Sequence, residues 1–128
     1  YWGETVLPIN DKVYQIQAGL IEELAEKGSC VIVGRCADFI LRDRTDTVNV
    51  FLTANDEFRK DRAINLYGCE PKKVADILRK TDKKRSNYYE YRTNRRWGEA
   101  SHYDLCIDVS RFGLDNCVEL IEKYIELK

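Results

Sequence analysis

The run Val31–Val33 constrains the fold of this chain more than any other segment. Its residues are apolar and β-branched, Cys30 precedes them, and Gly34 and Arg35 follow directly. A short, wholly apolar run of this kind is typical of a strand that is covered on both faces, as in a parallel sheet. Cys30–Val33 is therefore predicted to be a strand that ends with Gly34 and Arg35 at the carboxyl edge of a sheet. Open α/β sheets bind their ligands at that edge.

Helical and strand patterns alternate along the rest of the chain, which predicts a parallel α/β sheet with right-handed crossovers. The first expected helix is capped by Asn10 or Asp11, ends near Gly28 and has an apolar stripe. Three strands make a thin sheet, so we expect a further portion upstream of Tyr1. Residues 88–98 are expected to form a mobile loop. The stripe consists of Val13, Ile16, Leu20, Ile21 and Leu24. The other expected helices cover residues 36–41, residues 56–67, residue 70 into the following basic segment, and residue 114 onward. The other expected strands are 47–53 and 105–109.

Composition favours a cytoplasmic globular protein. The chain has 128 residues, 44% of them hydrophobic, and no apolar run near the roughly 20 residues of a membrane span. We expect one domain over residues 1–128. The five cysteines show no C-x-x-C spacing, which favours reduced structural thiols, and the single histidine, His102, offers no basis for a metal site.

Positive charge is concentrated between Arg79 and Arg96. This basic block holds eight basic residues and two acidic ones, a net charge of +6, although the whole chain carries −1. Such a local excess favours a site for a small polyanion over a generally basic nucleic-acid binder. Tyrosines interleave with the block and could stack on single-stranded nucleic acid, but their helical spacing favours packing instead.

The order of the elements, together with several local motifs, resembles the cytidylate kinase-like branch of the P-loop nucleoside monophosphate kinases. The resemblance extends from about Asn10 to Ile125. The motifs that carry it are CVIVGRCAD (30–38), VFLTANDEFR (50–59), the pair Arg59 and Arg62, DKKR (82–85) and YDLCID (103–108).

This resemblance implies an α/β fold of the three-layer P-loop kinase type, with a parallel sheet flanked by helices and a lid over about residues 63–98. In such kinases a first strand and a phosphate loop precede everything seen here, and that strand lies between those matching 30–33 and 47–53. No glycine of this chain is followed by Lys, so no G-x-x-x-x-G-K-[ST] loop is present. We therefore expect the first strand and P-loop to be missing from the 128 residues.

Arg35 and Asp38 are the substrate-binding residues that the resemblance implies on the acceptor side. A guanidinium can bind a phosphate through two hydrogen bonds. The alternative is that Arg35 is a structural partner of Asp38 or of a carbonyl group. Cytidylate kinases carry D-G-R-D here, but this chain has Val33 and Cys36 in place of the two acids. The family's magnesium and cytosine contacts are therefore not carried over to these positions.

The resemblance also assigns four residues to the start and end of the lid. Arg62 and Arg85 would be catalytic, because positive charge near the transferring phosphoryl group offsets the charge on its oxygens. Arg59 and Arg79 would bind substrate. The family's R-D-x-x-D-x-x-R motif fits Asp82 and Arg85, but its first arginine falls on Leu78, so Arg79 or Lys80 would substitute. The alternative for all these cations is a solvated helix face.

Two functions from different classes remain open. The first is ATP-dependent phosphoryl transfer to a nucleoside monophosphate or similar small acceptor, with ATP and Mg²⁺ as implied cofactors. The second is a nucleotide-binding or regulatory module that retains the kinase fold without turnover, which the loss of both acids favours. The expected partner is a small-molecule nucleotide, with no membrane and no nucleic acid; homo-oligomerisation is left open. No nucleophile or general base is implied, and phosphoryl transfer does not require one.

Overall fold

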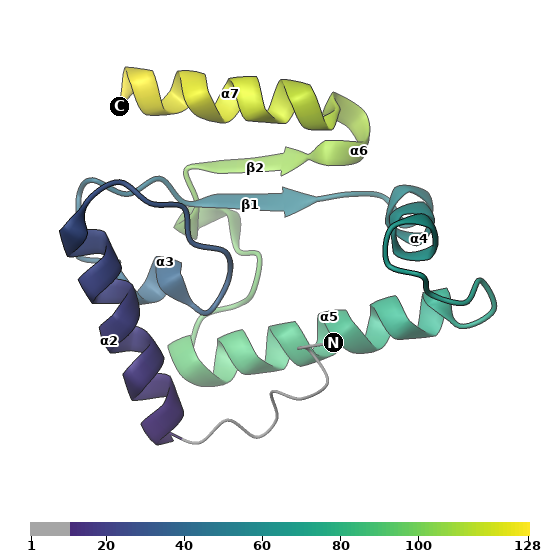
Figure 1. Cartoon of the computed structure of the whole chain (residues 1–128), viewed down its shortest axis with the longest axis horizontal. Coiled ribbons are helices and arrows are strands. Elements are labelled where there is room, and N and C mark those ends of the chain that lie inside the picture. Colours follow the sequence, from purple (N-terminus) through teal and green to yellow (C-terminus); the bar gives the residue numbers. More distant parts are fainter. Residues whose placement is uncertain (1–10) are drawn as a thin grey trace. The chain divides into compact units, whose positions relative to one another are not determined.

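The computed structural model describes residues 11–128, and these divide into two compact units. The first unit consists of residues 11–47 and 84–97, and the second of residues 48–83 and 98–128. Figure 1 shows the helices and strands with their labels. Within residues 11–128, no helix combines the length and the apolar character needed to cross a membrane. The expected Asn10 cap lies outside the described residues.

The first unit contains α2 (Asp11–Lys27), α3 (Ala37–Ile40) and the last turns of α5 (Val74–Thr93). The bounds of α2 confirm the predicted helix and its end before Gly28. Of the expected apolar stripe, however, Ile21 is the only member that is buried. The side chains of Val13, Ile16, Leu20 and Leu24 are 40–57% exposed. The covered face is shifted by one position and consists of half-buried Tyr14, Gln17, Ala18 and Ala25 beside Ile21.

The predicted strand at Cys30–Val33 is wrong for the structure as described. Residues 30–33 have no regular secondary structure, and the side chains of Val31 and Val33 are 93% and 85% exposed. A strand forms only when a neighbouring strand satisfies its backbone N–H and C=O groups. This segment therefore has the apolar sequence pattern of a strand but no hydrogen-bonded neighbouring strand.

The second unit is built on a two-stranded parallel sheet. β1 (Val50–Thr53) pairs with β2 (Leu105–Asp108), with Val50 opposite Leu105 and Thr53 opposite Asp108. This pairing confirms the parallel sheet and two of the expected strands. Ile107, Val109 and Cys117 form the buried core. The short η1 (Ala100–His102) precedes β2, and α6 (Val109–Phe112) and α7 (Leu114–Leu127) follow it (Figure 1).

Local capping explains where α4 (Asp56–Asn65) begins. The Asn55 side chain accepts a hydrogen bond from the Phe58 backbone N–H at 2.8 Å, which satisfies one free donor of the first turn.

Gly98 follows the last residue of the first unit at a φ of +78°. A Cβ there would lie 3.1 Å from the Phe51 ring, so a glycine is required for this close approach.

α5 is longer than predicted. It continues through Tyr88, Tyr89 and Tyr91 to Thr93, so the expected loop is wrong over residues 88–93. The Thr93 hydroxyl donates to the Tyr89 carbonyl at 2.7 Å and accepts from the Arg95 N–H at 3.1 Å. Asn94 then takes a φ of +56° and ends the helix.

Replacing Ile107 by alanine should destabilise the second unit, because Ile107 is 7% exposed at the centre of the core. The expected loss in the free energy of unfolding is about 2–5 kcal/mol. Ile125→Ala is the matched control, since Ile125 is 55% exposed on α7, and it should cost less than about 1 kcal/mol. Urea unfolding followed by circular dichroism measures both. Equal losses in the two variants would contradict this assignment of the core.

Candidate functional site

The turn Gly34–Cys36 has an unusual backbone. Gly34, Arg35 and Cys36 have φ values of +69°, +57° and +59°, so three consecutive residues lie in the left-handed region. Glycine adopts this conformation at little cost, but Arg35 and Cys36 each carry a Cβ that opposes it. The strain is of the order of 1–3 kcal/mol per residue, and it persists only where surrounding structure enforces it.

Contacts on both sides of the turn enforce this conformation. The Ala37 N–H donates to the Gly34 carbonyl at 3.1 Å, and the Cys36 side chain is buried at 4% exposure. On α3, the Asp38 carboxylate accepts a hydrogen bond from the Tyr89 hydroxyl at 2.7 Å. Tyr89 is 6% exposed on α5. The strained turn is thus attached to the last turns of α5 through Asp38.

Guanidinium groups surround this part of the first unit. Those of Arg42 and Arg95 lie 4.0 and 5.0 Å from the centroid of the Phe39 ring on α3. Such cation–π contacts are favourable when partly shielded from water. Two guanidinium groups therefore lie against the Phe39 ring of α3, the helix that follows the Gly34–Cys36 turn.

Arg92 of the basic block is not a solvated cation. Its side chain is 7% exposed and pairs with Asp11 at 2.6 Å between Nη1 and Oδ1. Its guanidinium lies 4.8 Å from the Tyr14 ring, 5.1 Å from Tyr91 and 6.0 Å from Tyr88. The signal that could have indicated this was the position of Tyr88 at i−4 to Arg92 on one helix.

The thiol of Cys36 is not a reactive nucleophile. Burial, and after it the charge of Asp38, raises the pKa of this thiol to about 12. Only the thiolate is nucleophilic. Cys36 therefore fills space under the strained turn and does no chemistry there.

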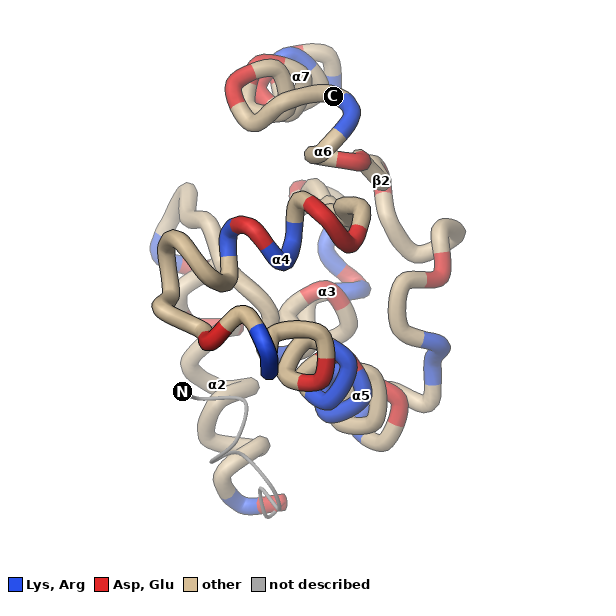
Figure 2. The backbone as a smooth tube through the Cα atoms, turned by 90° about the vertical axis from the view of Figure 1, so that its right-hand side faces the viewer, with Lys and Arg blue, Asp and Glu red and all other residues tan. Residues whose placement is uncertain are grey.

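Three of the predicted lid residues lie in the second unit. Arg59 of α4 pairs with Asp82 of α5, with 2.7 Å between Nη2 and Oδ1. Arg62 lies one turn further, with its guanidinium 5.6 Å from the Phe58 ring. Arg79 and Lys80 both pair with Asp76, and their hydrogen bonds lower the pKa of that carboxyl. Figure 2 shows how Lys and Arg residues crowd along α5.

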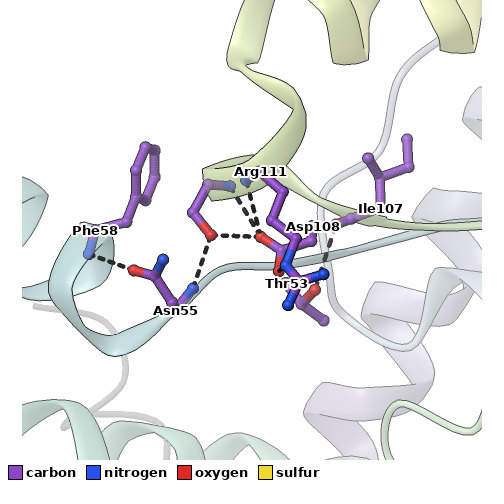
Figure 3. A network of polar contacts seen from close by, with 7 residues as sticks. Thr53, Asn55, Phe58, Ile107, Asp108 and Arg111 are labelled. Atoms are coloured by element: carbon purple, nitrogen blue, oxygen red, sulfur yellow. Dashed lines mark hydrogen bonds and ion pairs between the residues drawn. The ribbon is translucent and has the colours of Figure 1, made fainter.

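The carboxyl edge of the small sheet holds a polar network that the sequence analysis missed (Figure 3). Asp108 accepts hydrogen bonds from Ser110 and from the Arg111 N–H, and thereby caps α6. The Ser110 hydroxyl in turn accepts from the Asn55 N–H at 3.0 Å. The signal was available, because Asp108 lies near the end of the expected strand 105–109 and Ser110 directly follows it. These groups satisfy one another, so the network holds the strand ends and helix starts together.

The predicted site residues thus fall into two sets. Arg35, Asp38 and Arg85 belong to the first unit, where Arg35 and Asp38 flank the buried Cys36. Arg59, Arg62 and Arg79 belong to the second, where Arg59 is tied to Asp82. Over residues 11–128, no three His, Cys, Asp or Glu side chains gather into a group that could hold a metal ion.

We expect alkylation to distinguish Cys36 from the exposed thiols. In the folded protein at pH 8, iodoacetamide should modify Cys30 and Cys106, which are exposed, and leave Cys36 unmodified, because its thiol is buried with a raised pKa. Peptide mass spectrometry measures each site, and modification in denaturant is the control. Labelling of Cys36 as fast as Cys30 would show that the turn is not packed as described.

A double-mutant cycle on Arg59 and Asp82 should give a favourable coupling of about 0.5–1 kcal/mol, because both side chains are about one-third exposed. The Arg79 and Asp76 pair on one exposed helix turn is the matched control, with a smaller expected coupling. Urea unfolding of the single and double alanine variants measures both. A coupling near zero for Arg59 and Asp82 would mean that this ion pair does not hold α4 to α5.

Comparison with known proteins identifies the family. The sequence profile of the Cytidylate kinase-like family matches residues 4–111. No curated protein matches the chain. Among solved structures, an uncharacterized protein from Eubacterium ventriosum is similar, with 30% sequence identity and a TM-score of 0.87 over 97% of this chain and 70% of that chain. The coarse function that follows is nucleotide kinase-like. On the evidence of its strand order, its Gly34–Arg35 turn and the profile match, this chain belongs to the cytidylate kinase-like family.

Proposed function

We propose that the protein transfers a phosphoryl group from ATP to a nucleoside monophosphate or a similar small acceptor. The observation that carries this proposal is Arg35, half-buried in a strained turn that packing and the hydrogen bond between Tyr89 and Asp38 hold in place. Strained backbone of this kind is concentrated at functional sites. The family match supports the same reaction at a coarse level.

In this proposal the acceptor phosphate binds to the first unit. Arg35 forms the bidentate contact with the phosphate, which fixes the acceptor oxygen that attacks the donor. Asp38 is oriented by Tyr89 and is the acceptor-side carboxylate. Cys36 provides no carboxylate at the position where cytidylate kinases have one, so the proposal does not restrict the acceptor to CMP.

The remaining cations stabilise the charge of the transferring group. Arg62 and Arg85 are proposed to contact the phosphoryl oxygens. Arg59 is proposed to bind substrate from just before the lid over residues 63–98, and Arg79 from within it. Arg59 is already oriented by Asp82. Charge compensation and positioning supply most of the rate enhancement in phosphoryl transfer, so no nucleophilic side chain is needed.

ATP is the proposed donor, and the groups that bind its phosphates are expected on a further strand and P-loop. The exposed apolar side chains of Val31 and Val33 support this, because a parallel strand beside residues 30–33 would pair their backbone, and the crossover helices of such a sheet would cover these side chains. The groups that residues 11–128 offer do not fit Mg²⁺. Val33 has no oxygen ligand, the Cys36 thiol is protonated, and the described carboxylates form no ligand group.

The five free cysteines suit a reducing cytoplasm, where we place the protein.

Replacing Arg35 by glutamine should raise the KM for the acceptor by about 10- to 100-fold, because a charge-assisted contact to phosphate is lost. The assay mixes the full-length protein with ATP, Mg²⁺ and each nucleoside monophosphate in turn, and measures ADP. Arg44→Gln is the matched control, since Arg44 lies in the same unit but pairs with Glu26 and Asp46. Its KM should change less than about twofold. Absence of ADP with every acceptor would refute the proposed reaction.

A second function is favoured by the loss of both acids beside Gly34 and Arg35. In that case the protein binds a nucleotide as a regulatory module and does not turn it over. Calorimetry together with the ADP assay separates the two functions. The regulatory module would release heat on binding a monophosphate but would yield no ADP in the assay.

A further inference from the structure

One side of α7 carries an apolar stripe that residues 11–128 leave uncovered. The helix packs on the core of the second unit through Cys117, which is buried, and Ile121, which is half-buried. Beside these core positions lie Leu114, Val118 and Ile125, whose side chains are 46%, 55% and 55% exposed. Their spacing places them on one side of the helix. An apolar surface wider than one packing face is expected of a helix that packs against a second element as well.

The sheet surface next to this stripe is also uncovered. Val50 and Leu52 of β1 point to the same face as their register partners Leu105 and Ile107, and α7 packs on that face. Leu52 is nevertheless 53% exposed. Because α7 is a right-handed helix that runs antiparallel to both strands (Figure 1), Val118 turns toward β1 and away from the outer edge of β2. Leu52 and the stripe therefore border one apolar surface beside α7.

The outer edge of β1 has room for a further strand. The Leu105 N–H donates to the Asn49 carbonyl at 3.2 Å, so the backbone groups of Val50 and Leu52, which alternate with those of Asn49, point away from β2. Within residues 11–128 the sheet has two strands, and these groups have no strand partner. A strand at this edge would satisfy them. If the chain then continued away from β2 through a right-handed crossover, its helix would lie on the face that α7 occupies.

The outer surface of α7 adds a preference in charge. Its carboxylates Asp115, Glu119, Glu122 and Glu126 recur at i, i+4, i+7 and i+11. Among the described residues only Glu126 has a basic partner, Lys123, with 3.5 Å between Nζ and Oε2. A helix that packs on the stripe would bring its solvent-facing flank next to Asp115 and Glu122, where Lys or Arg is favoured. The surface therefore suits an amphipathic helix with a basic flank.

We propose that an amphipathic helix from the portion of the protein upstream of Tyr1 packs here, against Leu52 and the stripe of Leu114, Val118 and Ile125. The strand expected in the same portion would pair with the outer edge of β1, and the crossover rule then brings its helix to this surface. The similar solved chain also extends beyond the match, which covers 70% of it. The proposal concerns packing and does not depend on phosphoryl transfer.

Photocrosslinking in the full-length protein tests which segment covers the stripe. The photoreactive amino acid p-benzoylphenylalanine replaces Val118 in one variant and Leu127 in the other. Leu127 is the matched control, because it is 76% exposed on the opposite side of the same helix. After irradiation, the mass of the product and peptide mass spectrometry identify the partner. The label at position 118 should crosslink to a peptide upstream of Tyr1 in a product of monomer mass, and the label at position 127 should not form this product.

Alkylation gives a second readout with a smaller substitution. In the folded full-length protein, iodoacetamide should modify Val118→Cys several-fold more slowly than Leu127→Cys, and in denaturant the two rates should be equal. Equal rates in the folded protein, no crosslink from position 118, or a crosslink from it to residues 11–128 would overturn the proposal. A crosslink found only at dimer mass would also overturn it and would assign the surface to a second copy of the chain.

Discussion

The hydrogen bond between the Tyr89 hydroxyl and the Asp38 carboxylate is the constraint on which the candidate site depends. It connects a helix end to a turn whose backbone two residues, Arg35 and Cys36, adopt at a cost. Tyr89 is buried, so this bond is shielded from competing water. Loss of this bond would weaken the attachment of the turn to α5 and would leave the position of the Arg35 guanidinium less restricted.

The positive residues of the basic block have different roles in the structure. Part of its charge is structural, as in Arg92, which is buried among tyrosines and paired with Asp11. Part of the charge is paired with neighbouring carboxylates, as for Arg79, which pairs with Asp76. The charge that remains near the strained turn is what a phosphate would meet. A net charge of +6 in the sequence is therefore an upper limit on the charge available to a ligand.

The sequence predicted the elements whose partners are local or contained in the chain. α4 and its Asn55 cap depend on neighbouring residues, and β1 finds its parallel partner in β2. The strand at residues 30–33 failed because a strand needs a neighbour, which periodicity does not supply. The extent of α5 and the burial of Arg92 were also not predicted, because both depend on contacts that the tyrosines of α5 make with other residues of the first unit. Arg35 and Asp38 could be predicted from a motif, but the role of Tyr89 required the structure.

The central claim is that Arg35, presented by the strained turn, holds the acceptor phosphate. A crystal structure of the protein with bound CMP tests it most directly. We predict the phosphate within hydrogen-bonding distance of the Arg35 guanidinium, with the φ angles of Arg35 and Cys36 still positive and the bond between Tyr89 and Asp38 intact. A phosphate bound elsewhere, or a turn with negative φ at both residues, would contradict the account.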